Sequence, residues 1–155
     1  MITNEQYHAD PAVSASHLKA VMQSPYHYWS RYVDPNRKPL EPTAAMKLGS
    51  LAHCAILEPE ELLNRYGVCA PRNTKAGKEQ AAAMEAKGIE VVTSSDMALA
   101  MGMSAAVQAH PAAAALLADG KAEQSFWWID TATGLRCKCR PDWYQGSTIV
   151  DIKTT

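Results

Sequence analysis

The sequence has no excess of either charge and no hydrophobic segment near its start. Its 155 residues carry 15 basic and 16 acidic side chains, a formal net charge of −1. This balance excludes a histone-like polycation and an acidic disordered tail. Residues 1–10 have no apolar core of the kind that a secretory signal needs. We therefore expect a cytoplasmic protein whose four cysteines are reduced thiols.

The chain also lacks the cysteine spacing of a zinc site and a convincing membrane span. Cys137 and Cys139 are one residue apart, whereas zinc knuckles separate their pairs by two; small buried side chains are expected here. Residues 97–118 contain no Asp, Glu, Lys or Arg and are long enough to cross a bilayer. They are rich in alanine and include His110 and Pro111, which predicts two soluble helices meeting at that break and no membrane partner.

The chain consists of two parts that differ in amino-acid composition. Residues 1–120 are predicted to be helical, and residues 121–155 have the β-branched and aromatic composition of strands. Strands are expected over 122–130, 135–142 and 148–154, with tight turns between them. Helices followed by an antiparallel three-stranded meander predict a single α+β domain over 1–155.

The clearest helix is the one expected from Thr43. Its apolar residues keep the 3.6-residue period of one buried face: Ala45, Leu48, Leu51, Ala52, Ala55 and Ile56. Other helices are predicted from about Ser16, with Leu18, Val21 and Met22 on one apolar stripe, and over 79–87, 94–110 and 111–118. Three prolines make 34–42 a loop.

An aromatic cluster precedes that loop: Tyr26, Tyr28, Trp29 and Tyr32. These rings could stack on nucleic-acid bases. We favour the other interpretation, in which they are packing for the helix that follows, because aromatic side chains dominate core burial.

The last two predicted strands bring acidic residues together. Asp142 and Asp151 flank a short hairpin, whose two ends approach each other across the ladder. Two such carboxylates repel unless a cation such as Mg²⁺ lies between them. Because side chains alternate along a strand, Asp151 and Lys153 share one face, where the lysine could stabilise charge on a phosphate. A plain surface ion pair is the alternative for this pair.

These residues resemble sequence motifs of a known protein family. Pro141-Asp142 followed by Asp151-Ile152-Lys153 resembles the PD-(D/E)XK signature of metal-dependent nucleases. The helical segment Gly49-Ser-Leu-Ala-His53 resembles the G-x-x-x-H element of the RecB-like and RecE-like branches. Residues 14–19 with 24–26, and the strand order from Glu123 to 154, are similar to the RecE-like, exonuclease VIII-type nucleases of phages and prophages.

The resemblance implies a double-stranded DNA exonuclease, acting 5′ to 3′ with Mg²⁺ or Mn²⁺ beside a single-strand annealing protein, and a homo-oligomer that encloses the duplex. It assigns metal ligation to His53, Asp142, Asp151 and the Ile152 carbonyl, with Glu123 as a weaker candidate. Lys153 would be the catalytic lysine, acting with Asp142 and Asp151.

One departure from the family is expected at the carboxyl end. The nuclease core continues with a helix and a further strand, whereas this sequence ends directly after the third predicted strand. We expect those elements to be absent, and with them part of the substrate wall. A non-catalytic DNA-binding or assembly module of a recombination system is therefore the alternative function.

Overall fold

A computed structural model describes residues 2–38 and 40–154. Its amino-terminal part contains α1 (Asn4–Ala9), α2 (Ala15–Gln23), α3 (Pro25–Tyr28), the π-helical turn η1 (Trp29–Val33), α4 (Ala44–Leu57), η2 (Pro59–Glu61), α5 (Leu62–Arg65), β1 (Tyr66–Val68), α6 (Lys75–Glu85), β2 (Glu90–Val92), α7 (Ser94–Ala109) and α8 (Pro111–Leu116). The strands β3 (Lys121–Ala122), β4 (Phe126–Ile129), β5 (Arg136–Cys139), β6 (Trp143–Gln145) and β7 (Thr148–Val150) follow. The chain is thus mixed α and β, with small antiparallel sheets. Within these residues, no helix combines the length and the hydropathy that crossing a bilayer requires.

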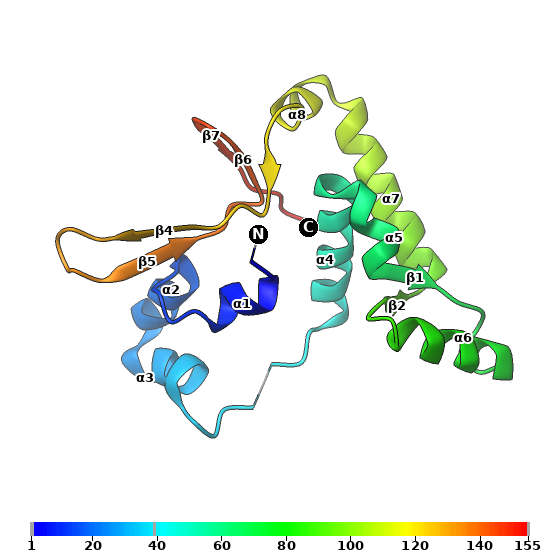
Figure 1. The fold of residues 1–155 in the computed structure, drawn as a ribbon, viewed down its shortest axis with the longest axis horizontal. Coiled ribbons are helices and arrows are strands. Elements are labelled where there is room, and N and C mark those ends of the chain that lie inside the picture. Colours follow the sequence, from blue (N-terminus) through cyan, green and yellow to red (C-terminus); the bar gives the residue numbers. More distant parts are fainter. Residues whose placement is uncertain (1, 39, 155) are drawn as a thin grey trace.

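Helix α4 is the centre of the helical part and packs on α7 (Figure 1). The Thr43 hydroxyl caps α4 by accepting a hydrogen bond from the Met46 backbone N–H, 3.2 Å away. Leu51 is completely buried, and the Ser104 hydroxyl of α7 donates to the Ala55 carbonyl across the interface at 2.8 Å. The predicted helix is confirmed, and its predicted apolar face is buried at Leu51, Ala52 and Ala55, whereas Ala45 in the first turn is exposed. Helix α4 is thereby held firmly enough to position the residues of its other face.

Residues 1–120 contain two strands as well as the predicted helices. Strands β1 and β2 form a parallel pair, with Tyr66 opposite Glu90, and α6 connects them. A parallel pair requires such a crossover. Helix α6 begins at Lys75 because the Thr74 hydroxyl accepts a hydrogen bond from the Gly77 N–H at 3.0 Å, so the predicted start at residue 79 is late by one turn.

The strands do not form the predicted continuous meander. Strands β4 and β5 make one hairpin, and β3, β6 and β7 make a separate sheet in that order. The first predicted strand is interrupted between β3 and β4, and the second ends at Cys139, before β6 begins at Trp143. Across these breaks the Glu123 N–H donates to the Asp142 carbonyl at 3.0 Å. The third strand ends at Val150 rather than at residue 154.

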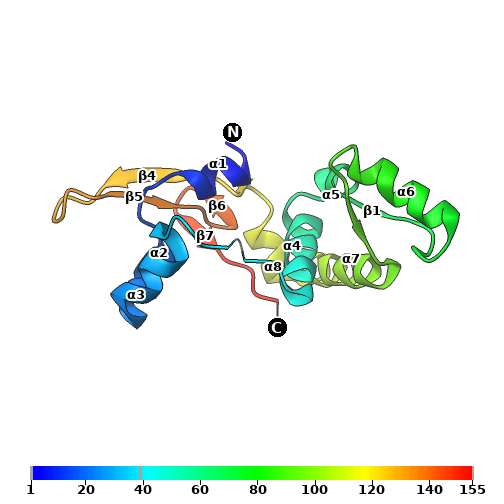
Figure 2. The same cartoon turned by 90° about the horizontal axis from the view of Figure 1, so that it is seen from below.

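Strand β5 anchors the amino-terminal helix. The Lys138 side chain is only 3% exposed, and its ammonium group donates to the backbone carbonyls of Tyr7 at 2.5 Å and Asp10 at 2.7 Å. The expectation that Cys137 and Cys139 are the buried residues of this strand is wrong, because both are half-exposed while the lysine between them faces inward. Figures 1 and 2 show α1, α2 and the β4–β5 hairpin on one side of the molecule and α4 to α7 on the other.

Candidate metal centre

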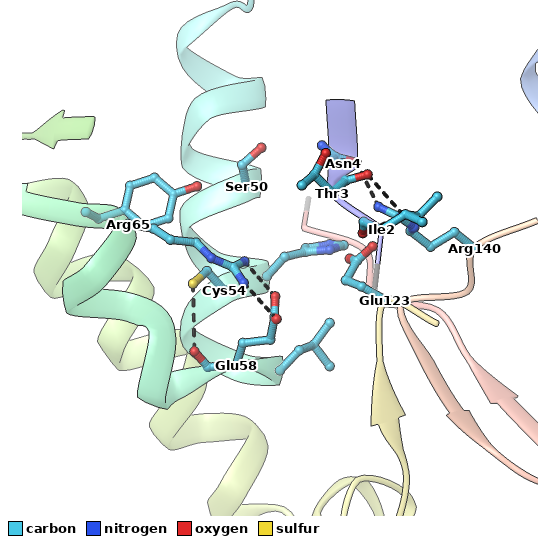
Figure 3. Close-up of a pocket in the computed structure, with 12 residues that line it drawn as sticks. Ile2, Thr3, Asn4, Ser50, Cys54, Glu58, Arg65, Glu123 and Arg140 are labelled. Atoms are coloured by element: carbon cyan, nitrogen blue, oxygen red, sulfur yellow. Dashed lines mark hydrogen bonds and ion pairs between the residues drawn. The ribbon is translucent and has the colours of Figure 1, made fainter. Parts of the chain in front are cut away.

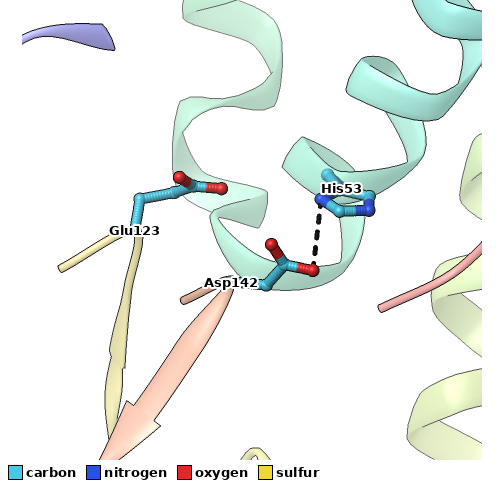
Figure 4. Close-up of side chains that lie close together, drawn as sticks. All are labelled: His53, Glu123 and Asp142. Carbon is cyan, nitrogen blue, oxygen red and sulfur yellow. Dashed lines mark ion pairs between the residues drawn. The ribbon is translucent and has the colours of Figure 1, made fainter. Parts of the chain in front are cut away.

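His53 comes from the face of α4 turned toward the strands. Its Nε2 lies 3.0 Å from the Ile152 carbonyl oxygen, and its Nδ1 lies 3.8 Å from Oδ2 of Asp142. A carbonyl oxygen can only accept a hydrogen bond, so Nε2 carries the hydrogen. The other nitrogen lies toward Asp142 (Figure 4). In the neutral imidazole this nitrogen has a lone pair for a metal ion, the arrangement of a metal-binding histidine whose second nitrogen is fixed by a backbone carbonyl.

The two carboxylates come from the interruptions of the sheet. Glu123 follows β3 with a backbone φ of +50°, a left-handed conformation that is uncommon for residues other than glycine. Asp142 precedes β6, and its Oδ2 accepts a hydrogen bond from the Ile152 N–H at 2.6 Å. One possible ligand atom from each of His53, Glu123 and Asp142 lies within 4.8 Å of the others. The strained backbone at Glu123 thus occurs where the side chain joins this group.

The electrostatics of this group favour a cation. Burial, followed by the negative charge of Asp142, raises the pKa of Glu123 above its usual value. Two carboxylates and one imidazole nitrogen form a donor set suited to a divalent cation. A divalent cation at this point would offset the repulsion that the metal-free protein carries, so the residues fit a divalent metal ion.

Asp151 and Lys153 lie beside this group and form an ion pair with each other. Both side chains are exposed, by 58% and 72% respectively. A hydrogen bond from Lys153 is the main cause that lowers the pKa of Asp151, and Asp142 and His53 also contribute. The same bond raises the pKa of Lys153. The ligand role of Asp151 and the catalytic role of Lys153 remain predictions, since the three-residue group forms without them.

The backbone of Ile152 contacts two side chains of the candidate site. Its N–H is bonded to Asp142, and its carbonyl accepts the hydrogen bond of His53. Both polar groups of this residue thus orient side chains of the candidate site. Its carbonyl as a direct ligand also remains a prediction.

The two sequence motifs lie side by side. Residues 152–154 leave the end of β7 and pass along α4, where a Cβ built on Gly49 would lie 3.5 Å from Oγ1 of Thr154. His53 is one turn further along the same helix. The G-x-x-x-H element and the carboxyl-terminal D-x-K element are therefore one spatial unit, although about 100 residues separate them.

A pocket of about 570 Å³ opens beside the group. His53 and Glu123 line it, together with Arg65, which binds Glu58 through two hydrogen bonds of 2.7 and 2.8 Å. Figure 3 shows this ion pair facing Glu123 and Arg140 across the pocket. Arg65 and Glu58 could not be identified from the sequence, because Glu58 follows the end of α4, Arg65 belongs to α5, and the two form no recognisable motif.

Comparisons with known proteins indicate a family. No curated protein is similar enough to the chain to count as a match. A family model described as a PDDEXK-like domain of unknown function (DUF3799) matches residues 14–155. That match includes His53, Glu123, Asp142 and Asp151 and covers nearly all of the sequence. The chain therefore belongs to this family of PD-(D/E)XK nuclease-like domains.

Proposed function

We propose that the protein is a metal-dependent nuclease that hydrolyses phosphodiester bonds of DNA. The observation that carries this proposal is the convergence of His53, Glu123 and Asp142, whose ligand atoms lie within 4.8 Å of one another in a PDDEXK-like chain. The three residues come from α4 and from two interruptions of the strands. Such a convergence of metal-ligating types beside a pocket is typical of a functional site rather than of a solvated surface.

Each residue has a separate task in this proposal. His53 and Asp142 hold Mg²⁺ or Mn²⁺ with Glu123, and Asp151 completes the set by turning away from Lys153. A bound divalent cation polarises the phosphate and lowers the pKa of bound water. Released from Asp151, the Lys153 ammonium group faces the scissile phosphate and stabilises the charge that develops there.

The finer assignment rests on the resemblance of the sequence motifs. It gives a 5′-to-3′ exonuclease on double-stranded DNA, acting with a single-strand annealing protein in recombination of the phage type. It also includes a homo-oligomer that surrounds the duplex. The resemblance of residues 14–19 and 24–26, and of the motif order from Glu123 to 154, to the RecE-like nucleases supports it.

The test is calorimetric titration of the metal-free protein with Mn²⁺. We expect binding that Asp142→Ala abolishes and Glu123→Gln weakens, whereas Glu60→Gln, which neutralises an exposed glutamate outside the site, leaves it unchanged. Asp151→Ala separates two versions of the site: lost binding places Asp151 among the ligands, and retained binding limits them to the three-residue group. Equal titrations for the wild type and Asp142→Ala would refute the metal centre.

The second candidate is a non-catalytic DNA-binding or assembly module. The ion pair that occupies Lys153 favours it, because a lysine bound to Asp151 is not free to act on a phosphate. Linear and circular duplex DNA, each labelled and incubated with Mg²⁺ or Mn²⁺, distinguish the two functions. Loss of the linear DNA alone supports the exonuclease, and binding without cleavage under either metal supports the module.

A further inference from the structure

The segment from residue 14 to residue 38 exposes aromatic rings. The packing interpretation of the aromatic cluster is right for only half of its residues, and their partner is not the helix that follows. Tyr28 and Tyr32 pack against each other, with ring centroids 5.5 Å apart, and both contact the ring of His17 on the preceding helix α2. For the other half it is wrong. Tyr26 is 70% exposed and Trp29 is 44% exposed.

The two exposed rings form a stacked pair. Their centroids are 6.2 Å apart and their planes differ by only 26°. Trp29 opens the π-helical turn η1, and such turns are frequent at functional sites. The ring contacts among Tyr28, Tyr32 and His17 attach α3 and η1 to α2. The two exposed rings are therefore carried by helical turns that pack on α2.

The same segment concentrates positive charge. It carries four cations, Lys19, Arg31, Arg37 and Lys38, against the single acid Asp34, although the whole chain has a net charge of −1. All four cations are exposed. Within residues 2–38 and 40–154, none of them forms an ion pair, so their charge is available to a polyanion.

We propose that this basic aromatic segment, residues 14–38, binds single-stranded DNA. A stacked pair of exposed rings offers a face to an unpaired base, and the surrounding cations neutralise the phosphates on either side. A duplex keeps its bases stacked inside and cannot use the rings in this way. The choice of DNA as the ligand rests on the proposed function, but the binding itself requires neither metal nor cleavage.

Apolar residues beside the rings do not change this assignment. Leu18 and Met22 of α2 are 56% and 85% exposed, so the apolar stripe predicted for that helix exists but is not part of the core. A protein partner or a second copy of the chain would also cover such a stripe. The uncompensated positive charge favours DNA over these occupants, and the experiment below tests them.

The experiment is fluorescence anisotropy with a labelled 12-nucleotide oligo(dT) in EDTA. We expect Trp29→Ala and Tyr26→Ala each to weaken binding on the order of tenfold. Trp128→Ala is the matched control, since it removes an indole that is 46% exposed on β4, and it should leave the affinity unchanged. Arg31→Ala should reduce the slope of log affinity against log salt by about 0.7.

Two further variants separate stacking from folding and from apolar docking. Trp29→Phe should retain binding, because it keeps an aromatic face. Trp29→Leu should lose binding although it keeps an apolar side chain. Equal binding by the wild type and Trp29→Leu would overturn the proposal, as would tighter binding of a 12-base-pair duplex than of oligo(dT).

The outcome is independent of the metal centre. Trp29→Ala should bind Mn²⁺ in calorimetry as the wild type does, so that loss of strand binding and loss of metal binding are separate results. If Trp29→Ala converts a dimer to a monomer in sedimentation and the wild type does not bind oligo(dT), the segment is a surface for a second copy and the proposal is wrong.

Discussion

Glu123→Gln should stabilise the metal-free protein. The ligand oxygens of Glu123 and Asp142 lie within 4.8 Å of each other, a separation at which two unit charges repel by roughly 3.5 kcal/mol at an effective dielectric constant of about 20. Both groups are partly accessible to water, so screening reduces the gain from removing one charge to about 1–2 kcal/mol. In a chain of this size that corresponds to a rise in Tm of roughly 2–8 °C.

The pH dependence of this gain follows from the raised pKa of Glu123. Because the folded protein holds the proton more tightly than the unfolded chain, the stability that Glu123 provides is complete below the ordinary pKa of 4.5. It is lost as the pH rises through the higher pKa of the folded state. Glu123→Gln should therefore melt at nearly the same temperature as the wild type at pH 4 and higher than the wild type at pH 8.

Differential scanning calorimetry at pH 4 and pH 8, with and without Mn²⁺, measures the change in stability and its dependence on pH and on metal. Mn²⁺ should raise the Tm of the wild type, because a ligand that binds only the folded state stabilises it, and should raise that of Glu123→Gln by less. Glu60→Gln is the control for loss of one charge. The reasoning would be refuted if Glu123→Gln melted below the wild type at pH 8 without metal. It would also be refuted if Mn²⁺ raised the Tm of Glu123→Gln by as much as it raises the Tm of the wild type.

Three other variants test separate parts of the site and fold. His53→Ala should weaken Mn²⁺ binding in calorimetry by at least about tenfold, the loss seen when even an outer partner of a metal site is removed. Lys153→Ala should lower the rate of duplex cleavage on the order of 10²–10³-fold while gel-shift affinity stays near that of the wild type. Lys138→Met leaves the carbonyls of Tyr7 and Asp10 without their donor and should cost about 2–4 kcal/mol in urea unfolding.

The parts of the fold that the sequence predicts well are those with a long periodic pattern. Helix α4 is 14 residues long and has a capping threonine and a regular apolar face. Its position and its buried side could therefore be predicted from the sequence. Strands β1 and β2 have three residues each, too few for an alternating pattern. Their parallel pairing depends on the distant packing of α6, which no local signal reports.

The candidate site, like the fold, is predicted from the sequence only in part. The sequence places Asp142 and Asp151 at opposite ends of a hairpin, and the pairing of Trp143 with Val150 confirms that neighbourhood. The surface ion pair that the sequence offered as the alternative for Asp151 and Lys153 is present. The sequence could not decide between this pair and a metal-bound Asp151, because an exposed carboxylate can bind either nearby cation. Nor does it reveal the left-handed backbone of Glu123, which comes from the break between β3 and β4 rather than from a glycine or a turn motif.

Gly49 provides the last test of how the two motifs fit together. Glycine inside a helix costs about 1 kcal/mol relative to alanine, yet Gly49 lies in the middle of α4. A Cβ at this position would be 3.5 Å from Oγ1 of Thr154, an ordinary contact distance. Gly49→Ala should therefore raise the stability of the metal-free protein by about 0.5–1 kcal/mol.

The same substitution narrows the space between α4 and the segment that carries Asp151 and Lys153. If Asp151 must move to reach the metal, Gly49→Ala should slow DNA cleavage while leaving Mn²⁺ binding by the three-residue group intact. Ala98→Gly, at an exposed position within α7, controls for helix propensity in the opposite direction. A less stable Gly49→Ala protein would show instead that the 152–154 segment already fills this space completely and cannot yield, which would contradict a mobile Asp151.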